Sequence, residues 1–196
     1  SWRNDRLDFR ATELVDIDSI DGGAGMDLIY GTRGDDLIIG GRGSDRLYGN
    51  HGNDRYQLSA GDGSDLLYDI SGHDRLEFVA ANHDQLWFER SDRDLVVSTI
   101  GTSDGVRIRN WYRSSNNQVE SITTRDDRAL TNAAVDQLVT AMAAFTKPGI
   151  GKTELGQTVR DELALVSLLH RDFRKYGMLG VVPGCAVDAT ERDLLR

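Results

Sequence analysis

The chain has 196 residues, 39% of them hydrophobic, with 21 glycines and only 2 prolines, which allows one domain or two small abutting units. Its 32 acidic and 23 basic residues give a formal net charge of −9, which argues against nucleic acid as a partner because phosphates need a basic surface. One cysteine, Cys185, provides no intrachain disulfide framework, and no apolar run reaches the roughly 18 residues of a transmembrane segment.

The N-terminal flank, residues 1–17, carries no apolar segment of the kind found in cleavable secretory peptides. We therefore interpret the chain as part of a longer protein, and we expect the organised structure to begin after this flank.

Four consecutive nonapeptides begin at Gly22: GGAGMDLIY, GTRGDDLII, GGRGSDRLY and GNHGNDRYQ. Each has glycine at positions one and four, aspartate at position six and a large apolar residue at position eight. The same frame continues with lower fidelity on both sides, so that the aspartates in frame are Asp18, Asp27, Asp36, Asp45, Asp54, Asp62, Asp65, Asp69, Asp74 and Asp84. A repeat of this period predicts a parallel β-roll over residues 18–84.

Each position of the repeat has a physical interpretation. Glycines at positions one and four are expected to allow positive φ angles and close packing of one turn on the next. The remaining three residues form a short strand whose middle side chain points inward. The predicted core is therefore a stack of the position-eight residues, namely Ile29, Ile38, Leu47, Tyr56, Leu67 and Leu76.

Successive units should alternate between the two edges of a flattened coil. This places Asp18, Asp36, Asp54 and Asp74 along one edge and Asp27, Asp45, Asp65 and Asp84 along the other. At a strand spacing of roughly 4.8 Å, unneutralised carboxylates would repel one another strongly. Carboxylate and carbonyl oxygens in a flexible site of six to eight ligands favour Ca²⁺.

The nonapeptides resemble the GGxGxDxUx repeat of the RTX, or haemolysin-type calcium-binding, family. The resemblance implies a mainly β fold, a parallel β-roll with about six calcium ions bound between neighbouring turns. Position-six carboxylates and the backbone carbonyls of positions one and three would be the ligands. From the four regular units these are Gly22, Ala24, Asp27, Gly31, Arg33, Asp36, Gly40, Arg42, Asp45, Gly49, His51 and Asp54.

Residues 85–146 are predicted to cap the roll, because a stack of repeats otherwise ends in exposed core and an open sheet edge. Strands are expected at 85–90, 94–100, 106–109 and 118–122, followed by a helix that starts at Thr131-Asn132. The core of this cap should contain Trp87, Phe88, Trp111 and Tyr112. The stretch from DQLWFERSD to NWYRSSNNQVE resembles the capping segment that follows the last RTX block in adenylate cyclase toxins.

Residues 147–196 contain a predicted second helix from about residue 153 to 175. The family resemblance implies an uncleaved type I secretion signal at this end, whereas the pattern fits equally well an amphipathic helix that packs on the cap.

No catalytic constellation accompanies the repeats, so we expect a non-catalytic module. Gly101-Thr102-Ser103-Asp104-Gly105 matches the G-x-S-x-G motif but joins two predicted strands, which favours a hairpin turn. The histidines lack zinc-ligand spacing.

The resemblance further implies a secreted, extracellular bacterial protein that folds on calcium binding outside the cell and leaves through a type I secretion apparatus. The alternative is a calcium-rigidified adhesion module that binds a host cell surface or receptor through exposed strand residues, for which Arg46, Tyr48, Arg55 and Tyr68 are candidates.

Overall fold

The computed structural model describes residues 2–13, 19–152, 155–156 and 159. Asp18, Cys185 and nearly all of the predicted C-terminal helix and secretion signal therefore lie outside the described residues.

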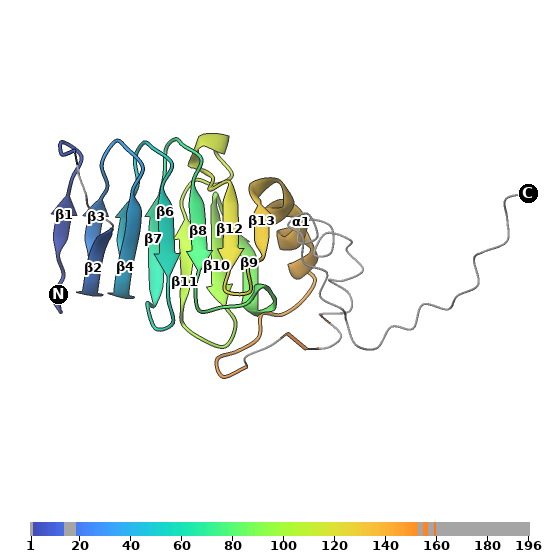
Figure 1. Ribbon diagram of the computed structural model, residues 1–196. Coiled ribbons are helices and arrows are strands. Elements are labelled where there is room, and N and C mark those ends of the chain that lie inside the picture. The colour runs from blue at the N-terminus through green and yellow to red at the C-terminus, as the bar shows by residue number, and fades with distance from the viewer. Residues whose placement is uncertain (1, 14–18, 153–154, 157–158, 160–196) are drawn as a thin grey trace, which may run out of the picture.

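Two β-sheets run along the molecule, and the repeat region supplies strands to them in alternation (Figure 1). The seven-stranded sheet contains, in spatial order, β1 (Arg6–Asp8), β3 (Leu28–Tyr30), β5 (Arg46–Tyr48), β7 (Ser64–Tyr68), β11 (Gly105–Ile108), β10 (Asp94–Thr99) and β9 (Leu86–Ser91). The six-stranded sheet contains β13 (Ala129–Thr131), β12 (Ser121–Thr124), β8 (Arg75–Phe78), β6 (Arg55–Leu58), β4 (Leu37–Gly43) and β2 (Ile20–Gly25). Neighbouring strands from β1 to β8 pair in parallel, which confirms the predicted parallel β-roll.

The side chains at position eight fill the space between the two sheets. All six predicted core residues have 0% exposed area: Ile29, Ile38, Leu47, Tyr56, Leu67 and Leu76. Burial of a side chain of this size stabilises the fold by about 1.5–3 kcal/mol. The core prediction is confirmed at every one of these positions.

The roll begins earlier than the repeats indicated. β1 lies in the predicted N-terminal flank and pairs in parallel with β3, with Arg6 opposite Leu28. Leu7 packs against the core, and the backbone N–H of Asp5 donates to Oδ1 of Asp27 over 2.6 Å. Asp5 and Leu7 thus stand at positions six and eight of a further unit.

The cap continues the roll before it changes direction. β11 pairs in parallel with β7, and β12 pairs in parallel with β8. β10, β9 and β13 then add antiparallel strands, and α1 (Asn132–Met142) packs beside β9. Trp87, Phe88 and Trp111 are buried, which confirms the predicted cap core. Tyr112 is half-buried, with the guanidinium of Arg90 over its ring.

The predicted last repeat unit, which carried Asp84, does not form. Asp84 lies in the short 3-10 helix η1 (His83–Gln85). The strand that follows β7 in its sheet is β11, where Val106 stands opposite Asp65. Asp84 is therefore not part of the edge row, because the chain leaves the roll after β8 to build the cap.

Candidate metal centre

The position-six aspartates form two rows, one along each edge of the roll. In one row, the backbone N–H of Asp27 donates to Oδ1 of Asp45 over 2.7 Å, and that of Asp45 donates to Oδ1 of Asp65 over 2.9 Å. The other row repeats this contact with distances of 2.9 Å from Asp36 to Asp54 and 2.9 Å from Asp54 to Asp74. These are the predicted rows without Asp18, which is outside the described residues, and without Asp84, which lies in η1. Each carboxylate reaches the turn of the preceding unit on its edge.

The second oxygen of these carboxylates is what indicates a metal. Among the described residues, the buried Oδ2 atoms of Asp27, Asp45, Asp54 and Asp74 have no hydrogen-bond partner. Leaving a buried polar atom without a partner costs about 1–3 kcal/mol, and more for a charged group. A cation between neighbouring turns would satisfy these oxygens and neutralise the row.

Position one of the repeat leaves room for the same oxygens. A Cβ built on Gly40 would lie 2.6 Å from Oδ2 of Asp45, and the same distance separates a Cβ built on Gly22 from Oδ2 of Asp27. The positive φ angles fall instead at positions two and four, as in Gly41 (90°) and Gly43 (146°). The prediction of positive φ at position one was wrong, because glycine is needed there to make space for the carboxylate.

The unit from Gly31 to Asp36 departs from this geometry. Its position two is Thr32, whose N–H donates to Oδ2 of Asp36 over 2.7 Å and whose hydroxyl lies 3.1 Å and 3.0 Å from the two carboxylate oxygens. Asp36 is therefore satisfied by its own turn, unlike the other buried aspartates of its row.

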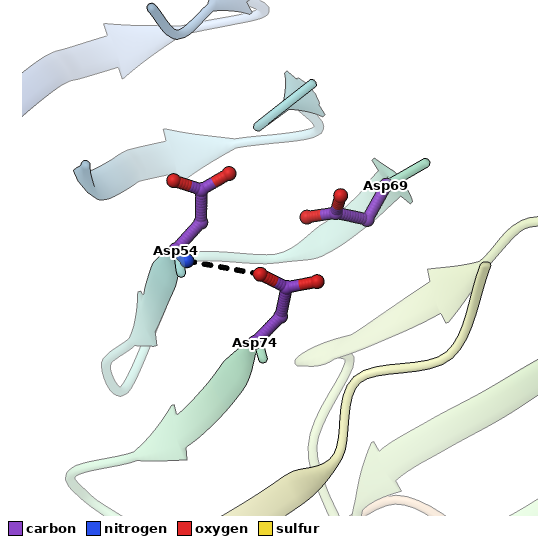
Figure 2. Close-up of side chains that lie close together, drawn as sticks. All are labelled: Asp54, Asp69 and Asp74. Atoms are coloured by element: carbon purple, nitrogen blue, oxygen red, sulfur yellow. Dashed lines mark hydrogen bonds between the residues drawn. The ribbon is translucent and has the colours of Figure 1, made fainter. Parts of the chain in front are cut away.

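Three carboxylates lie close together at the end of the second row, next to the cap (Figure 2). One oxygen from each of Asp54, Asp69 and Asp74 lies within 4.8 Å of the others, and all three residues are buried. Burial, together with the neighbouring Asp69, raises the pKa of Asp54 to about 8 and that of Asp74 to about 7. A cation bound among the three carboxylates would lower these pKa values and favour the ionised forms.

Residues 21–56 match the RTX calcium-binding nonapeptide repeat in 4 copies. Residues 94–127 match the haemolysin-type calcium binding protein related domain. Residues 21–56 are thus a block of RTX calcium-binding repeats. RTX repeats bind calcium. The carboxylate oxygens without a partner, and the space that the position-one glycines leave beside them, fit a hard cation with oxygen ligands. The predicted Ca²⁺ is therefore the metal that this module binds.

The backbone donors implied by the RTX resemblance lie in the stacked turns. Ala24 stands opposite Arg42 where β2 and β4 pair, and the side chain of Arg42 is exposed, so its backbone alone is available to a site. His51 likewise directs its ring outward, with Nδ1 2.6 Å from Oγ of Ser71. Arg33 is exposed in the turn that contains Thr32.

Asp62 occupies position three of its unit. Its carboxylate accepts the N–H of Ser59 over 2.6 Å, and its carbonyl accepts the N–H of Gly43 over 2.8 Å. Burial raises the pKa of Asp62. Its side chain, unlike those of other position-three residues, is thus buried within the edge.

Two acidic residues of the cap were missed by the repeat frame. Oε2 of Glu120 accepts the N–H of Asp74 over 2.7 Å, which is the contact that the next aspartate of the row would make. The carboxylate of Asp104 accepts the N–H groups of Gly61 and Gly63 over 2.8 Å and 3.1 Å. Glu120 was detectable, because Glu120 and Ile122 repeat the spacing of positions six and eight. Asp104 and Val106 have the same spacing, but Val106 and not Asp104 stands opposite Asp65, so the repeat frame does not predict the contact of Asp104.

Among the residues that the structure describes, no helix combines the length and apolarity needed to cross a membrane.

Proposed function

We propose that this RTX module is the calcium-driven folding switch of a secreted bacterial protein. It would pass through a type I secretion apparatus unfolded and fold outside the cell, in the manner of the adenylate cyclase toxins. Within the part of the chain that the structure describes, four buried Oδ2 atoms have no hydrogen-bond partner. They carry this proposal, because they make the metal-free roll costly and the calcium-loaded roll favourable.

The energetics follow from the edge rows. Stacked buried carboxylates lose hydration and repel one another, so the roll is disfavoured where calcium is submicromolar, as inside a bacterium. In millimolar calcium outside the cell, ions bind only to the folded turns. Since the sites do not exist in the unfolded chain, their binding free energy becomes folding free energy.

The proposed ligands are the position-six carboxylates together with backbone carbonyls of positions one and three. The set comprises Gly22, Ala24, Asp27, Gly31, Arg33, Asp36, Gly40, Arg42, Asp45, Gly49, His51, Asp54, Asp62, Asp65, Asp69 and Asp74, with Asp18 outside the described residues. Pairing neighbouring turns along both edges gives about six ions. We propose that the module has two units, the roll, which includes β1, and the cap of residues 85–146. Calcium binding would make the two units fold together.

Far-UV circular dichroism of the purified chain, titrated with Ca²⁺ and separately with Mg²⁺, tests the switch. We expect a cooperative transition from coil to β-structure near millimolar Ca²⁺. Mg²⁺ should not produce it, because this ion demands near-octahedral geometry and gives up its waters reluctantly. A fully folded spectrum in excess chelator would contradict the proposal.

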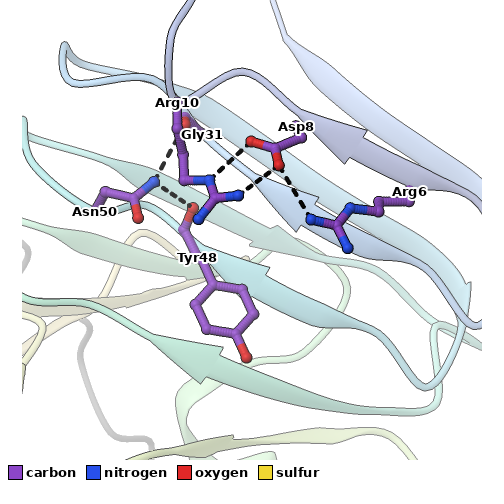
Figure 3. Close-up of polar contacts among 6 residues, drawn as sticks. All are labelled: Arg6, Asp8, Arg10, Gly31, Tyr48 and Asn50. Atoms are coloured by element: carbon purple, nitrogen blue, oxygen red, sulfur yellow. Dashed lines mark hydrogen bonds and ion pairs between the residues drawn. The ribbon is translucent and has the colours of Figure 1, made fainter.

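An adhesion module is the second candidate, and one surface feature favours it. Tyr30, Tyr48 and Tyr68 stack along the outer face of their sheet, with ring centroids 4.5 Å and 4.6 Å apart. Arg10 lies over the end of this ladder, 4.3 Å from the Tyr30 centroid, and is held by Asp8 at 2.8 Å and 2.6 Å (Figure 3). Calcium-dependent binding to host cells that is lost in Tyr48→Ala, with the fold intact, would support this alternative.

A further inference from the structure

Asp69 departs from the repeat at position one, where the four regular units have glycine. Its side chain points into the edge of the roll, between Asp54 and Asp74 (Figure 2). In the first three regular units, the space beside the position-one glycine holds the carboxylate of position six alone. Here the carboxylate of Asp69 lies in the same region, so two carboxylates share it.

The neighbouring turn is open to this cluster. A Cβ built on Gly49 would overlap Oδ2 of Asp54 and the hydroxyl of Tyr56, and would lie 2.8 Å from Oδ2 of Asp69. Three oxygens from three strands or turns thus converge beside one glycine. Asp54 and Asp74 are 0% and 2% exposed, and among the described residues the Oδ2 atom of each has no hydrogen-bond partner.

Tyr56 is a second departure from the repeat, since the other position-eight residues are isoleucine or leucine. Its hydroxyl donates to Oδ2 of Asp69. Oδ1 of Asp69 accepts the N–H of Ile70 over 2.6 Å and that of Ser71 over 3.3 Å. These donors fix the orientation of the additional carboxylate, so that little ordering remains to be done when an ion binds.

The cap also holds this cluster in place. Nδ2 of Asn117 donates to the carbonyl of Asp69 over 2.8 Å, and Glu120 accepts the N–H of Asp74. The cluster therefore lies where the last repeat turn meets the cap.

We infer that Asp54, Asp69 and Asp74 form a three-carboxylate calcium site, with Tyr56 as the residue that positions Asp69, and that it binds the first and tightest ion of the chain. The inference rests on the proposed calcium switch. Ordinary edge sites offer two carboxylates, one from each neighbouring turn, and the affinity of oxygen sites for calcium rises with the number of charged ligands.

The test is a calcium titration of the full chain in competition with a chromophoric chelator, which resolves the tightest binding step. We expect the first ion to bind about tenfold or more tightly than the remaining ions. Asp69→Asn should abolish this difference and leave the weaker steps unchanged. Tyr56→Phe should weaken the first step several-fold, because it keeps all three carboxylates and removes only the hydroxyl that positions one of them.

Asp35→Asn is the matched control. Asp35 is exposed, lies in a turn of the same edge, and accepts the N–H of Asn53 over 2.6 Å. Its substitution removes one negative charge and keeps an acceptor oxygen, so the first step should keep wild-type affinity. An equal loss in Asp35→Asn and Asp69→Asn would show a general charge effect and overturn the assigned site.

Asp69→Gly provides a second variant that restores the residue of the regular repeat. We expect it to fold in saturating calcium, as judged by circular dichroism, and to lack the tight first step. Wild-type affinity for the first ion in either Asp69 variant would overturn the inference, as would failure of Asp69→Gly to fold in saturating calcium. Absence of any calcium binding by the wild-type chain would instead refute the proposed function itself.

Discussion

Gly40 lies against the carboxylate of Asp45, and a Cβ built on it would lie 2.6 Å from Oδ2. A real side chain at this position must push the carboxylate out of the place where it faces the neighbouring turn. The backbone angle is not the obstacle, because the positive φ angles of this turn belong to Gly41 and Gly43. At the residue scale, glycine at position one of the repeat is therefore needed to make room for a carboxylate of the proposed metal site, and not to allow a particular turn conformation.

The substitution Gly40→Ala should raise the calcium concentration at the midpoint of folding. Overpacking of this kind costs about 1–3 kcal/mol, and here the displaced group is a proposed ligand. Gly34→Ala is the control, since the nearest atom to a Cβ there is Oγ1 of Thr32 at 3.7 Å. Equal midpoints for the two variants in a circular dichroism titration would show that the space beside Gly40, which the Asp45 carboxylate occupies, has no role in calcium binding.

At the scale of single elements, the turn between β10 and β11 closes one edge of the roll. Asp104 in that turn accepts the N–H groups of Gly61 and Gly63, which lie 43 and 41 residues earlier in the chain. Without a carboxylate there, the N–H groups of Gly61 and Gly63 would lose this hydrogen-bond acceptor. The turn thus acts on the roll as a further repeat would.

Asp104→Ala should destabilise the calcium-loaded chain by about 1–3 kcal/mol, the cost of leaving hydrogen-bonding groups unsatisfied. Urea denaturation in saturating calcium measures this change. Glu89→Ala, at an exposed position of β9, serves as the control and should stay near wild type. A Glu89 variant as unstable as the Asp104 variant would remove the case for edge closure.

The core of the cap is a second prediction at the element scale. Trp111 is 1% exposed, and truncation of a buried aromatic residue costs about 3–5 kcal/mol. We expect Trp111→Ala or Trp87→Ala to abolish calcium-induced folding, because the roll would lose the unit that covers its end. Trp2→Ala should fold normally, since Trp2 is 86% exposed. Complete calcium-induced β-structure in the Trp111 variant would show that the roll folds without an intact cap.

The sequence predicted those features of the elements that recur at fixed positions. The six position-eight side chains, the first at Ile29 and the last at Leu76, were predicted as core, and the aspartates between Asp27 and Asp74 were predicted to form two rows. Both predictions were possible because each unit supplies the same residue type to the same place. The contacts of Asp104 with Gly61 and Gly63 are made once, outside the repeat frame, so the repeat did not predict them. Asp84 was misplaced because its spacing imitates the repeat while its segment folds into the cap.

At the scale of the whole molecule, the two rows make the stability of the roll depend on pH. Burial raises the pKa of Asp45 to about 6, of Asp54 and Asp65 to about 8, and of Asp74 to about 7. A carboxyl group whose pKa is higher in the folded chain stabilises that chain while both states are protonated. This contribution is lost as the pH rises from the unfolded value of about 4 through the folded values.

Calcium removes this dependence, because the calcium-loaded roll and, above about pH 5, the unfolded chain both carry ionised carboxylates. We therefore expect residual β-structure in chelator to decline between about pH 5 and pH 8, following the raised pKa values of the aspartates. Over the same interval, the calcium concentration at the folding midpoint should not fall, because folding from the unfolded chain releases no protons from these carboxyl groups. Circular dichroism at a series of pH values, with calcium buffered at each one, measures both trends. A midpoint that falls as the pH rises would mean that calcium displaces protons from a metal-free roll that is already folded, which would contradict the folding switch.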